Sequence, residues 1–199
     1  MPLQDEYNKR SLIIKKRLED FSKINKEDYF YEACFCILTP QSSAKQSWKC
    51  ILLLKENDFF NKDINPVIYL SNKIRFHNNK AKYLLELKEK WSIVSKKIEE
   101  VKNSYKLREY LVSYVKGYGY KETSHFLRNI GHRDLAILDR HILKNLHKNN
   151  VISELPSALT KKKYLEIEEK FKDFSNGLKI PMDELDLLFW SMETGEVFK

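Results

Sequence analysis

Apolar residues recur at three- and four-residue steps along much of the chain, which is the spacing of one face of an α-helix. The longest such pattern predicts a helix over about 79–100, and a second pattern continues through 107–115. The apolar positions of the longer helix are Tyr83, Leu84, Leu87, Trp91, Val94 and Ile98. Near the start of the chain, Leu12, Ile13 and Leu18 lie among charged residues and predict an N-terminal helix.

Residues that break helices are scarce in the remaining sequence, because the 199 residues include only five glycines and five prolines. Further helices are predicted at 30–38, 43–55, 64–70, 122–129, 140–148, 160–174 and 182–192. The strict alternation of apolar and polar residues that indicates a strand is absent, and no repeat or low-complexity tract occurs. We therefore predict an all-α fold of about ten helices.

Composition narrows the class of protein but not its partner. The chain is 42% hydrophobic and 13% aromatic, which excludes a wholly disordered protein and fits one domain or two small lobes that share a core. Lys and Arg number 36 against 28 Asp and Glu, so the net charge is +8. This surplus fits phosphate binding, but it fits equally the Lys-rich composition of proteins from AT-rich genomes.

Several other classes are excluded. No run approaches the ~18 apolar residues that cross a bilayer, and the first residues lack the basic and apolar stretches of a secretory signal. Cys34, Cys36 and Cys50 cannot form an even disulfide framework, and no histidine cluster gives them zinc-finger spacing. Because these cysteines lie in apolar helical runs, we expect small buried hydrophobic side chains. We expect a soluble protein of a reducing compartment, without a membrane partner or a bound metal.

The segment 115–124 carries the strongest indication of function. One predicted helix ends, Gly117 and Gly119 flank a single residue, and the next helix begins at once. Glycines at this spacing allow a tight turn, while the start of the second helix offers free N–H groups and the positive end of its dipole. Together these features predict a site for a DNA phosphate that needs no base contact. The alternative is an ordinary joint between two helices with a glycine cap.

Two further residues favour catalysis over simple binding. Lys121 stands at the start of the second helix, where the dipole disfavours a cation and so favours the neutral amine that attacks carbon. Asp139 follows 139 − 121 = 18 residues later, after the apolar run 135–138 and at the start of another helix. As an N-cap it has a structural role, and it can also direct its carboxylate toward a substrate. The two residues can alternatively form a structural ion pair.

A helix–hairpin–helix followed by Lys121 and, before a later helix, Asp139 resembles the endonuclease III superfamily of DNA glycosylases. Within it the chain is similar to the archaeal-type 8-oxoguanine DNA glycosylase/AP lyase branch, from about residue 28 to the end. The matching segments are GYKETSHFLRNIG at 119–131, AILDRHIL at 136–143, DLLFW at 186–190, TGEVFK at 194–199, TPQSSA at 39–44, RF at 75–76 and NKAKY at 79–83.

The resemblance implies a single glycosylase unit over 1–199, with two helical lobes and the active site in the cleft between them. The first lobe spans 26–146 and contains the hairpin at 105–130, and the second combines 1–25 with 147–199. It also implies a monomer that acts on double-stranded DNA containing oxidised guanine. The expected location is the cytoplasm of a prokaryote, beside the nucleoid.

The same resemblance implies a mechanism for base excision. The damaged nucleotide leaves the duplex, Lys121 attacks C1′ and displaces the base, and the Schiff base then loses the 3′-phosphate by β-elimination. Asp139 stabilises positive charge on the sugar and assists deprotonation. Phe76 and Trp190 sandwich the flipped base, although each can instead be a core residue. The α-carboxylate of Lys199 accepts the N7–H that 8-oxoguanine carries and guanine lacks.

Five further residues are predicted to contact DNA, namely Gly117, Gly119, Gln41, His125 and Arg128. Gln41 resembles the wedge that fills the gap left by the extruded base, or it begins a helix. His125 lies one turn after Lys121 on the same helix face, with Arg128 three residues beyond it. His125 contacts a phosphate, orients Asp139 or has a structural role.

Two absences sharpen the resemblance. Endonuclease III carries four C-terminal cysteines that hold an iron–sulfur cluster, whereas no cysteine follows Cys50 here, so we expect no cofactor. The N-terminal β-domain of the eukaryotic 8-oxoguanine enzyme is also missing. Two alternatives remain open: a glycosylase of this superfamily for another oxidised base, and a non-catalytic DNA-binding helical module.

Overall fold

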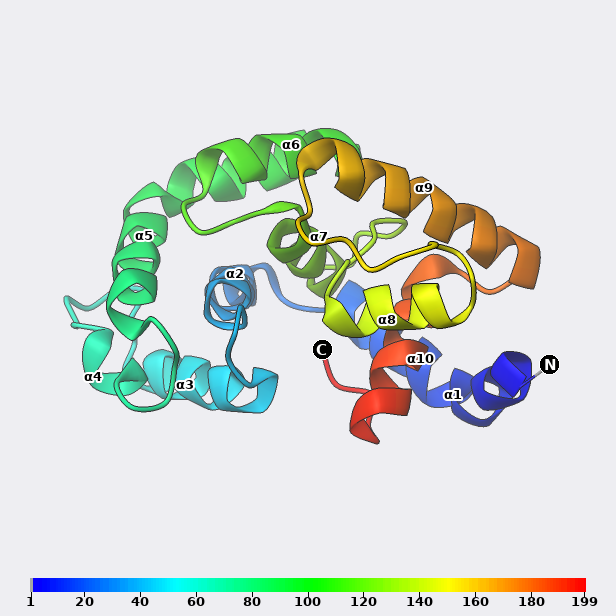
Figure 1. Cartoon of the computed structure of the whole chain (residues 1–199). Helices are drawn as coiled ribbons and strands as arrows, with labels where there is room; N and C mark the ends of the chain where they lie inside the picture. Colours follow the sequence, from blue (N-terminus) through cyan, green and yellow to red (C-terminus); the bar gives the residue numbers. More distant parts are fainter. Residues whose placement is uncertain (1) are drawn as a thin grey trace. The chain divides into compact units, whose positions relative to one another are not determined.

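The structure is a computed structural model that describes residues 2–199, and Figure 1 shows that it is built from helices. No strand occurs among these residues, so the predicted all-α fold is confirmed. None of the helices in the described part of the chain has the length and apolar character needed to cross a bilayer. The elements are α1 (Pro2–Ser22), η1 (Lys26–Asp28), α2 (Tyr29–Leu38), α3 (Ala44–Glu56), α4 (Val67–Leu70), α5 (His77–Glu100), α6 (Ser104–Tyr114), α7 (Tyr120–Asn129), α8 (Arg140–Lys148), α9 (Lys161–Leu178) and α10 (Met182–Thr194).

The chain divides into two compact units. Ile24–Phe126 form the central unit, and the residues up to Lys23 together with Leu127–Lys199 form the terminal unit. The lobes predicted from the sequence change over at residue 146, which is 146 − 126 = 20 residues later than this division. The boundary lies earlier because α8 packs against α10 and therefore belongs with the C-terminal helices.

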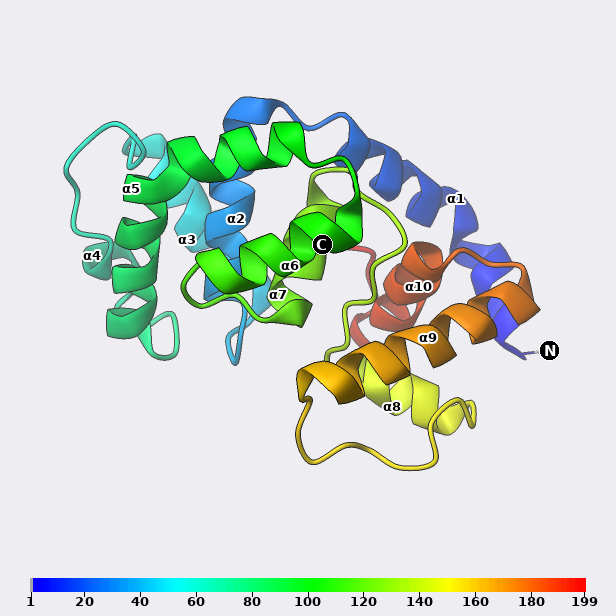
Figure 2. The ribbon, with the colours of Figure 1, turned by 90° about the horizontal axis from the view of Figure 1, so that it is seen from above.

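In the central unit, α2 is the innermost helix. Its side chains from Phe30 to Leu38 are all buried. Helices α3 and α5 pack against it, and Figures 1 and 2 show them beside it. Cys34 and Cys36 lie on α2 and Cys50 on α3. All three are free and fully buried, which confirms the prediction of small buried side chains. Burial raises the pKa of the Cys34 thiol well above its ordinary value, which makes it unreactive.

In the terminal unit, α10 holds the corresponding inner position. Its residues from Met182 to Phe189 are all buried, and α1, α8 and α9 pack against it. Its buried face is unusual because it includes the carboxylates of Asp183, Glu184 and Asp186. Each of these needs a polar partner, since burying an unpaired charge is costly.

Two predicted elements differ from the structure. On α1 the buried residues are Ile14, Leu18 and Phe21, whereas Leu12 and Ile13 are 81% and 59% exposed. The predicted helix at 64–70 is only the single turn of α4, with Pro66 as its N-cap. A residue before proline is disfavoured in helical conformation, so the turn cannot extend toward residue 64.

Candidate active site

The hairpin between α6 and α7 depends on one glycine in particular. Gly117 has φ +87°, a conformation that side chains disfavour, and a Cβ there would lie 2.7 Å from Cδ2 of Tyr83 on α5. Gly119 has no such backbone requirement, because a Cβ there would meet only the end of the flexible Glu122 side chain at 3.0 Å. The tight turn predicted for both glycines is therefore imposed mainly by Gly117.

Glu122 closes the N-terminus of α7. Its Oε2 accepts the Gly119 N–H at 3.2 Å, and the Thr123 hydroxyl donates to the Gly119 carbonyl at 2.8 Å. A Glu three residues after an N-cap commonly binds the N-cap amide in this way. A phosphate that reaches the Gly119 amide must therefore displace Glu122, which the predicted phosphate site did not include.

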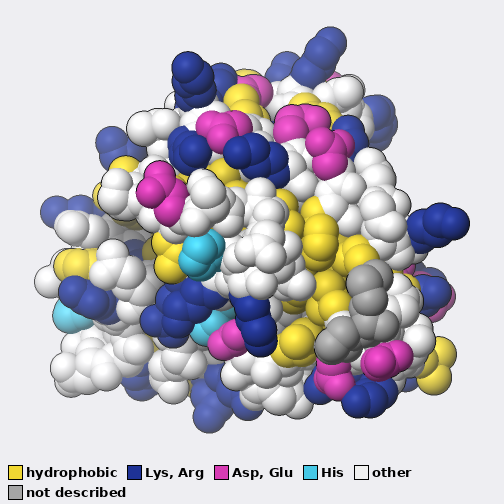
Figure 3. All heavy atoms as spheres, turned by 45° about the vertical axis from the view of Figure 1, so that its right-hand side comes forward, with side chains coloured by type: hydrophobic (Ala, Val, Ile, Leu, Met, Phe, Trp, Pro, Cys, Tyr) yellow, Lys and Arg dark blue, Asp and Glu magenta, His cyan; other side chains and the backbone are white. Residues whose placement is uncertain are grey.

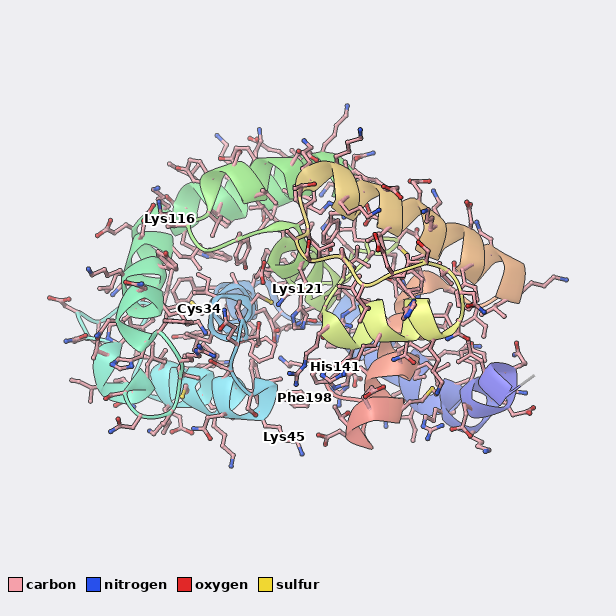
Figure 4. All side chains as sticks on the ribbon, viewed as in Figure 1. Cys34, Lys45, Lys116, Lys121, His141 and Phe198 are labelled. Carbon is pink, nitrogen blue, oxygen red and sulfur yellow. The ribbon has the colours of Figure 1, made fainter. Side chains whose placement is uncertain are left out.

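Lys121 lies in the first turn of α7, as predicted, and Figure 4 labels it together with Lys116 of the preceding turn. Its side chain is 25% exposed, and its Nζ lies 2.9 Å from Oε1 of Glu122. Glu122 thus connects the amine to the hairpin backbone. Glu122 was not among the predicted site residues, although its spacing from Gly119 is the signal that could have identified it.

A second lysine amine is buried in the central unit. Lys80 on α5 is only 5% exposed, and its Nζ donates to three oxygens at the end of α2 and in the loop that follows. These are the carbonyls of Leu38 at 2.7 Å and Pro40 at 2.6 Å, and the hydroxyl of Ser42 at 3.1 Å. Sequence analysis assigned no role to this residue, because a lysine in a helix is ordinarily exposed.

Lys80 also shares its surroundings with Lys121. The pKa of Lys80 is lowered to about 8, mainly by desolvation and also by the positive charge of Lys121, while Glu122 acts in the opposite direction. A buried ammonium loses its hydration, so the neutral form is favoured. The central unit therefore places two amines and one carboxylate within electrostatic reach of one another.

Gln41 and Phe76 occupy loops of the same unit, and both have left-handed backbone conformations. Their φ angles are +55° and +57°, which is unusual for residues other than glycine. Both side chains are exposed, Phe76 to 51%, so neither belongs to the core. The Arg75 guanidinium lies 4.9 Å from the centroid of the Phe76 ring. The core-packing alternative for Phe76 is thus wrong.

Asp139 belongs to the terminal unit and caps α8. Its Oδ1 accepts the N–H groups of His141 and Ile142, both at 2.8 Å, and its side chain is partly exposed. The segment before it is fixed in turn, since the Tyr164 hydroxyl donates to the carbonyl of Ala136 at 2.6 Å. The predicted N-cap role of Asp139 is confirmed, and its position is held firmly by the backbone.

Trp190 and Lys199, predicted to line the base pocket, lie in the terminal unit. Trp190 is half-buried on α10, and its ring meets that of His141 edge-on with centroids 5.2 Å apart. The indole Nε1 of Trp190 has no hydrogen-bond partner among residues 2–199. Lys199 follows the C-cap Gly195 at the chain end and is partly exposed. Figure 4 labels His141 and Phe198 of this region.

The structure places two predicted DNA contacts in the core. Arg128 is 3% exposed, and its Nη1 pairs with Oδ2 of Asp186 at 2.5 Å, so its side chain is engaged inside the protein and its DNA contact stays a prediction. His125 is 8% exposed and meets the Phe35 ring edge-on at 5.5 Å, which supports its structural alternative. Burial raises the pKa of Asp186 to about 7, although Arg128 acts in the opposite direction.

The basic side chains form no single stripe on the face drawn in Figure 3, where they alternate with acidic ones. Among residues 2–199 no group of three His, Cys, Asp or Glu side chains is placed to hold a metal ion. Lys121 and Phe76 belong to the central unit, whereas Asp139 belongs to the terminal unit. The convergence of Lys121 and Asp139 on one sugar, and the cleft between lobes, stay predictions.

Comparison with known proteins gives consistent results. A sequence profile described as "8-oxoguanine DNA glycosylase" matches residues 14–180. The chain is 47% identical over 204 residues to the "8-oxoguanine DNA glycosylase/AP lyase" of Fusobacterium nucleatum, and the alignment covers 97% of this chain and 94% of the relative.

Two crystal structures have similar folds. One is the Methanocaldococcus jannaschii 8-oxoguanine glycosylase/lyase in complex with a 15mer DNA containing 8-oxoguanine. Its TM-score is 0.87 and its identity 36%, and the match covers 100% of both chains. The other is the 8-oxoguanine DNA glycosylase of Thermotoga maritima, with a TM-score of 0.89 and 28% identity, covering 100% of this chain and 97% of that one.

Proposed function

Because the chain belongs to the family of 8-oxoguanine DNA glycosylases, we propose that it excises 8-oxoguanine from DNA and then cleaves the strand as an AP lyase. The resemblance inferred from the hairpin and Asp139 motifs is thereby confirmed. The observation that carries the proposed chemistry is the amine of Lys121. It is partly exposed, lies directly after the hairpin glycines and is held by Glu122.

In the proposed reaction the Lys121 amine attacks C1′ of the extruded nucleotide. A bond forms between Nζ and C1′ as the bond from C1′ to the base breaks, and the base leaves. Only a neutral amine can attack, so the ammonium must first lose a proton. Oε1 of Glu122 lies 2.9 Å from Nζ and is the acceptor within reach in the central unit.

The second half of the reaction cleaves the strand. The sugar ring opens as the Schiff base forms, a proton leaves C2′, and the 3′-phosphate departs by β-elimination. Asp139 has the chemistry to stabilise positive charge on the sugar, because its cap hydrogen bonds fix the carboxylate through Oδ1. Because the backbone holds this carboxylate, little reorganisation is needed when charge develops.

The proposed base pocket uses Phe76, Trp190 and the terminal carboxylate of Lys199. The exposed ring of Phe76 offers a face for stacking on a purine, and Trp190 offers another aromatic surface. The Lys199 carboxylate can accept a hydrogen bond from the N7–H of 8-oxoguanine. Guanine has no hydrogen at N7 and would leave this acceptor unpaired, which disfavours it.

The proposed partner is duplex DNA that contains oxidised guanine, bound by one copy of the chain in the cytoplasm, beside the nucleoid. The Methanocaldococcus jannaschii relative has been crystallised with a 15mer DNA containing 8-oxoguanine. In the proposal the hairpin around Gly117 approaches a phosphate, Gln41 fills the gap left by the flipped base, and no cofactor takes part.

Borohydride trapping on a duplex with one 8-oxoguanine tests the proposal. We expect the wild-type protein to form a covalent adduct with DNA, Lys121→Gln to form none, and Asp139→Asn to form it more slowly. Lys116→Gln is the matched control, because Lys116 is an exposed amine of the same hairpin and should still permit trapping. A wild-type protein that binds the duplex without being trapped would contradict the proposal, as would stronger trapping on thymine glycol.

A further inference from the structure

Two loops of the central unit meet at the buried amine of Lys80. Its three hydrogen-bond acceptors lie at the end of α2 and in the loop after it, namely the carbonyls of Leu38 and Pro40 and the hydroxyl of Ser42. An ammonium has three donors, so each of them is used here. The cation thereby fixes the conformation of this loop from inside.

The second loop is joined to the same group. The backbone N–H of Arg75 donates to the Ser42 hydroxyl at 3.2 Å, so Ser42 accepts from both this loop and Lys80. The backbone N–H of Lys80 donates to the Phe76 carbonyl at 3.0 Å, which starts α5 directly beneath the second loop. Ser42 and Lys80 therefore connect the segment around residue 41 with the segment ending at residue 76.

Each of these loops has exposed side chains on left-handed backbone, and the second loop also includes Asn72, with φ +60°. Gln41 and Phe76 have φ of +55° and +57°, and neither position is glycine. Such conformations persist only where the surrounding structure holds them. Gln41 and Phe76 are the two side chains of the central unit to which the proposed function gives the gap and the flipped base.

We propose that Lys80 is a positioning residue for lesion recognition, whose ammonium holds Gln41 and Phe76 in place through Ser42 and the two carbonyls that it binds. The inference rests on the proposed function, because Gln41 and Phe76 matter only if the chain binds a flipped base. Lys80 itself does not touch the substrate. It acts through the two loops.

A cation is a costly way to fill this space. Burial lowers the pKa of Lys80 to about 8, so the fold works against its charge, whereas an apolar side chain would avoid that cost. What an apolar side chain cannot do is bind these three oxygens at once. The lysine therefore contributes by fixing the conformation of the segment that contains Gln41.

The first measurement is single-turnover excision of 8-oxoguanine by Lys80→Met, with Lys82→Met as the control. Lys82 lies two positions along α5 and is exposed, so its loss leaves both loops unchanged. We expect Lys80→Met to slow excision by on the order of tenfold to a hundredfold, as small displacements of contacting groups do. We expect Lys82→Met to act like the wild type. Equal rates for the two variants would overturn the inference.

A second measurement separates positioning from simple structural support. In a Gln41→Ala/Phe76→Ala background the loops present nothing for Lys80 to position, so adding Lys80→Met should change the excision rate by less than about twofold. A loss as large as that in the wild-type background would mean that Lys80 only supports the fold, and would overturn the inference. Stacking contributes at most a few kcal/mol per base, so the background remains measurable.

Ser42→Ala provides the test if Lys80→Met does not fold. This variant keeps the buried amine and its two carbonyl partners but removes the link to Arg75. We expect a smaller loss of excision that is also absent in the Gln41→Ala/Phe76→Ala background. Rates equal to the wild type would contradict the inference. If the wild-type protein itself fails to excise 8-oxoguanine, the proposed function is the part that fails.

Discussion

The central unit buries the cation of Lys80 among neutral oxygens, whereas the terminal unit buries the carboxylate of Asp186 against the guanidinium of Arg128. Lys80 binds the end of α2, the innermost helix of the central unit, and Asp186 lies on α10, the innermost helix of the terminal unit. Burial works against both, since it lowers the pKa of Lys80 to about 8 and raises that of Asp186 to about 7. Each unit therefore buries a charge that desolvation disfavours, but the central unit pairs it with neutral oxygens and the terminal unit with an opposite charge.

The difference shows what each arrangement is suited to do. A charge held by carbonyls and a hydroxyl orders the backbone that carries them, and here that backbone bears an exposed Gln41. A charge held by an opposite charge joins two side chains, and here it fixes residues 127–129, which belong to the terminal unit, against α10. We infer that the first arrangement serves presentation of residues to DNA and the second serves stability.

The largest effect on stability is expected from breaking the buried ion pair. Arg128→Met leaves the carboxylate of Asp186 buried without its counter-charge, which should lower the free energy of unfolding by about 3–5 kcal/mol. Urea unfolding measures this. Arg10→Met is the control, because the pair of Arg10 with Glu6 lies at the surface of α1 and contributes less than about 1 kcal/mol. Similar losses for both variants would contradict the proposed stabilising role.

A smaller loss is expected in the central unit. Lys80→Met leaves two buried carbonyls without a donor but also removes a buried charge, so we expect a loss of about 1–3 kcal/mol in urea unfolding. If this variant loses as much stability as Arg128→Met, the distinction between the two units is wrong.

The buried carboxylate of the terminal unit can also be tested through the pH dependence of the free energy of unfolding. The pKa of Asp186 is raised from 3.8 to about 7, so the folded protein binds an extra proton between these values. Stability from this group is full below pH 3.8 and is lost as the pH rises toward 7. Asparagine does not titrate, so Asp186→Asn lacks this pH dependence. As the pH rises from 4 to 7, we expect the urea midpoint of the wild type to fall relative to that of Asp186→Asn. Parallel curves for the two proteins would count against the raised pKa.

The smallest effect on stability is expected at the candidate nucleophile. Lys121→Gln removes a partly exposed pair with Glu122 and should cost only about 0–1 kcal/mol, although it should abolish trapping. Glu122→Ala should cost more, because Glu122 also caps the Gly119 amide. Thermal unfolding of both variants checks this order. A strongly destabilised Lys121→Gln would mean that its loss of activity reports on folding.

The helices could be predicted well from the sequence, because the apolar spacing that indicates a helix involves only residues three or four positions apart. It could not choose the buried face of α1, where three consecutive apolar residues, Leu12, Ile13 and Ile14, point in different directions. Only packing against α10 selects Ile14. The shortening of α4 was within reach of the sequence, since Pro66 marks it.

In the candidate site too, features set by local sequence could be predicted, whereas those set by long-range packing could not. Lys121 and Asp139 could be found because their positions at helix starts are local features. Lys80 could not, since its burial depends on a loop about 40 residues earlier that nothing in its own helix indicates. The burial of Arg128 was equally hard to foresee, because its partner Asp186 is 58 positions away.

The terminal unit is made from both ends of the polypeptide, so that the Tyr7 hydroxyl binds the Glu184 carboxylate across 177 positions. The central unit is continuous in the chain. During synthesis α1 emerges before α10 and must wait for it. The residues that present Gln41 and the Lys121 amine can fold well before then, because domains generally fold as they emerge. The nascent protein therefore completes its nucleophile half while the half that carries Asp139 is still being translated.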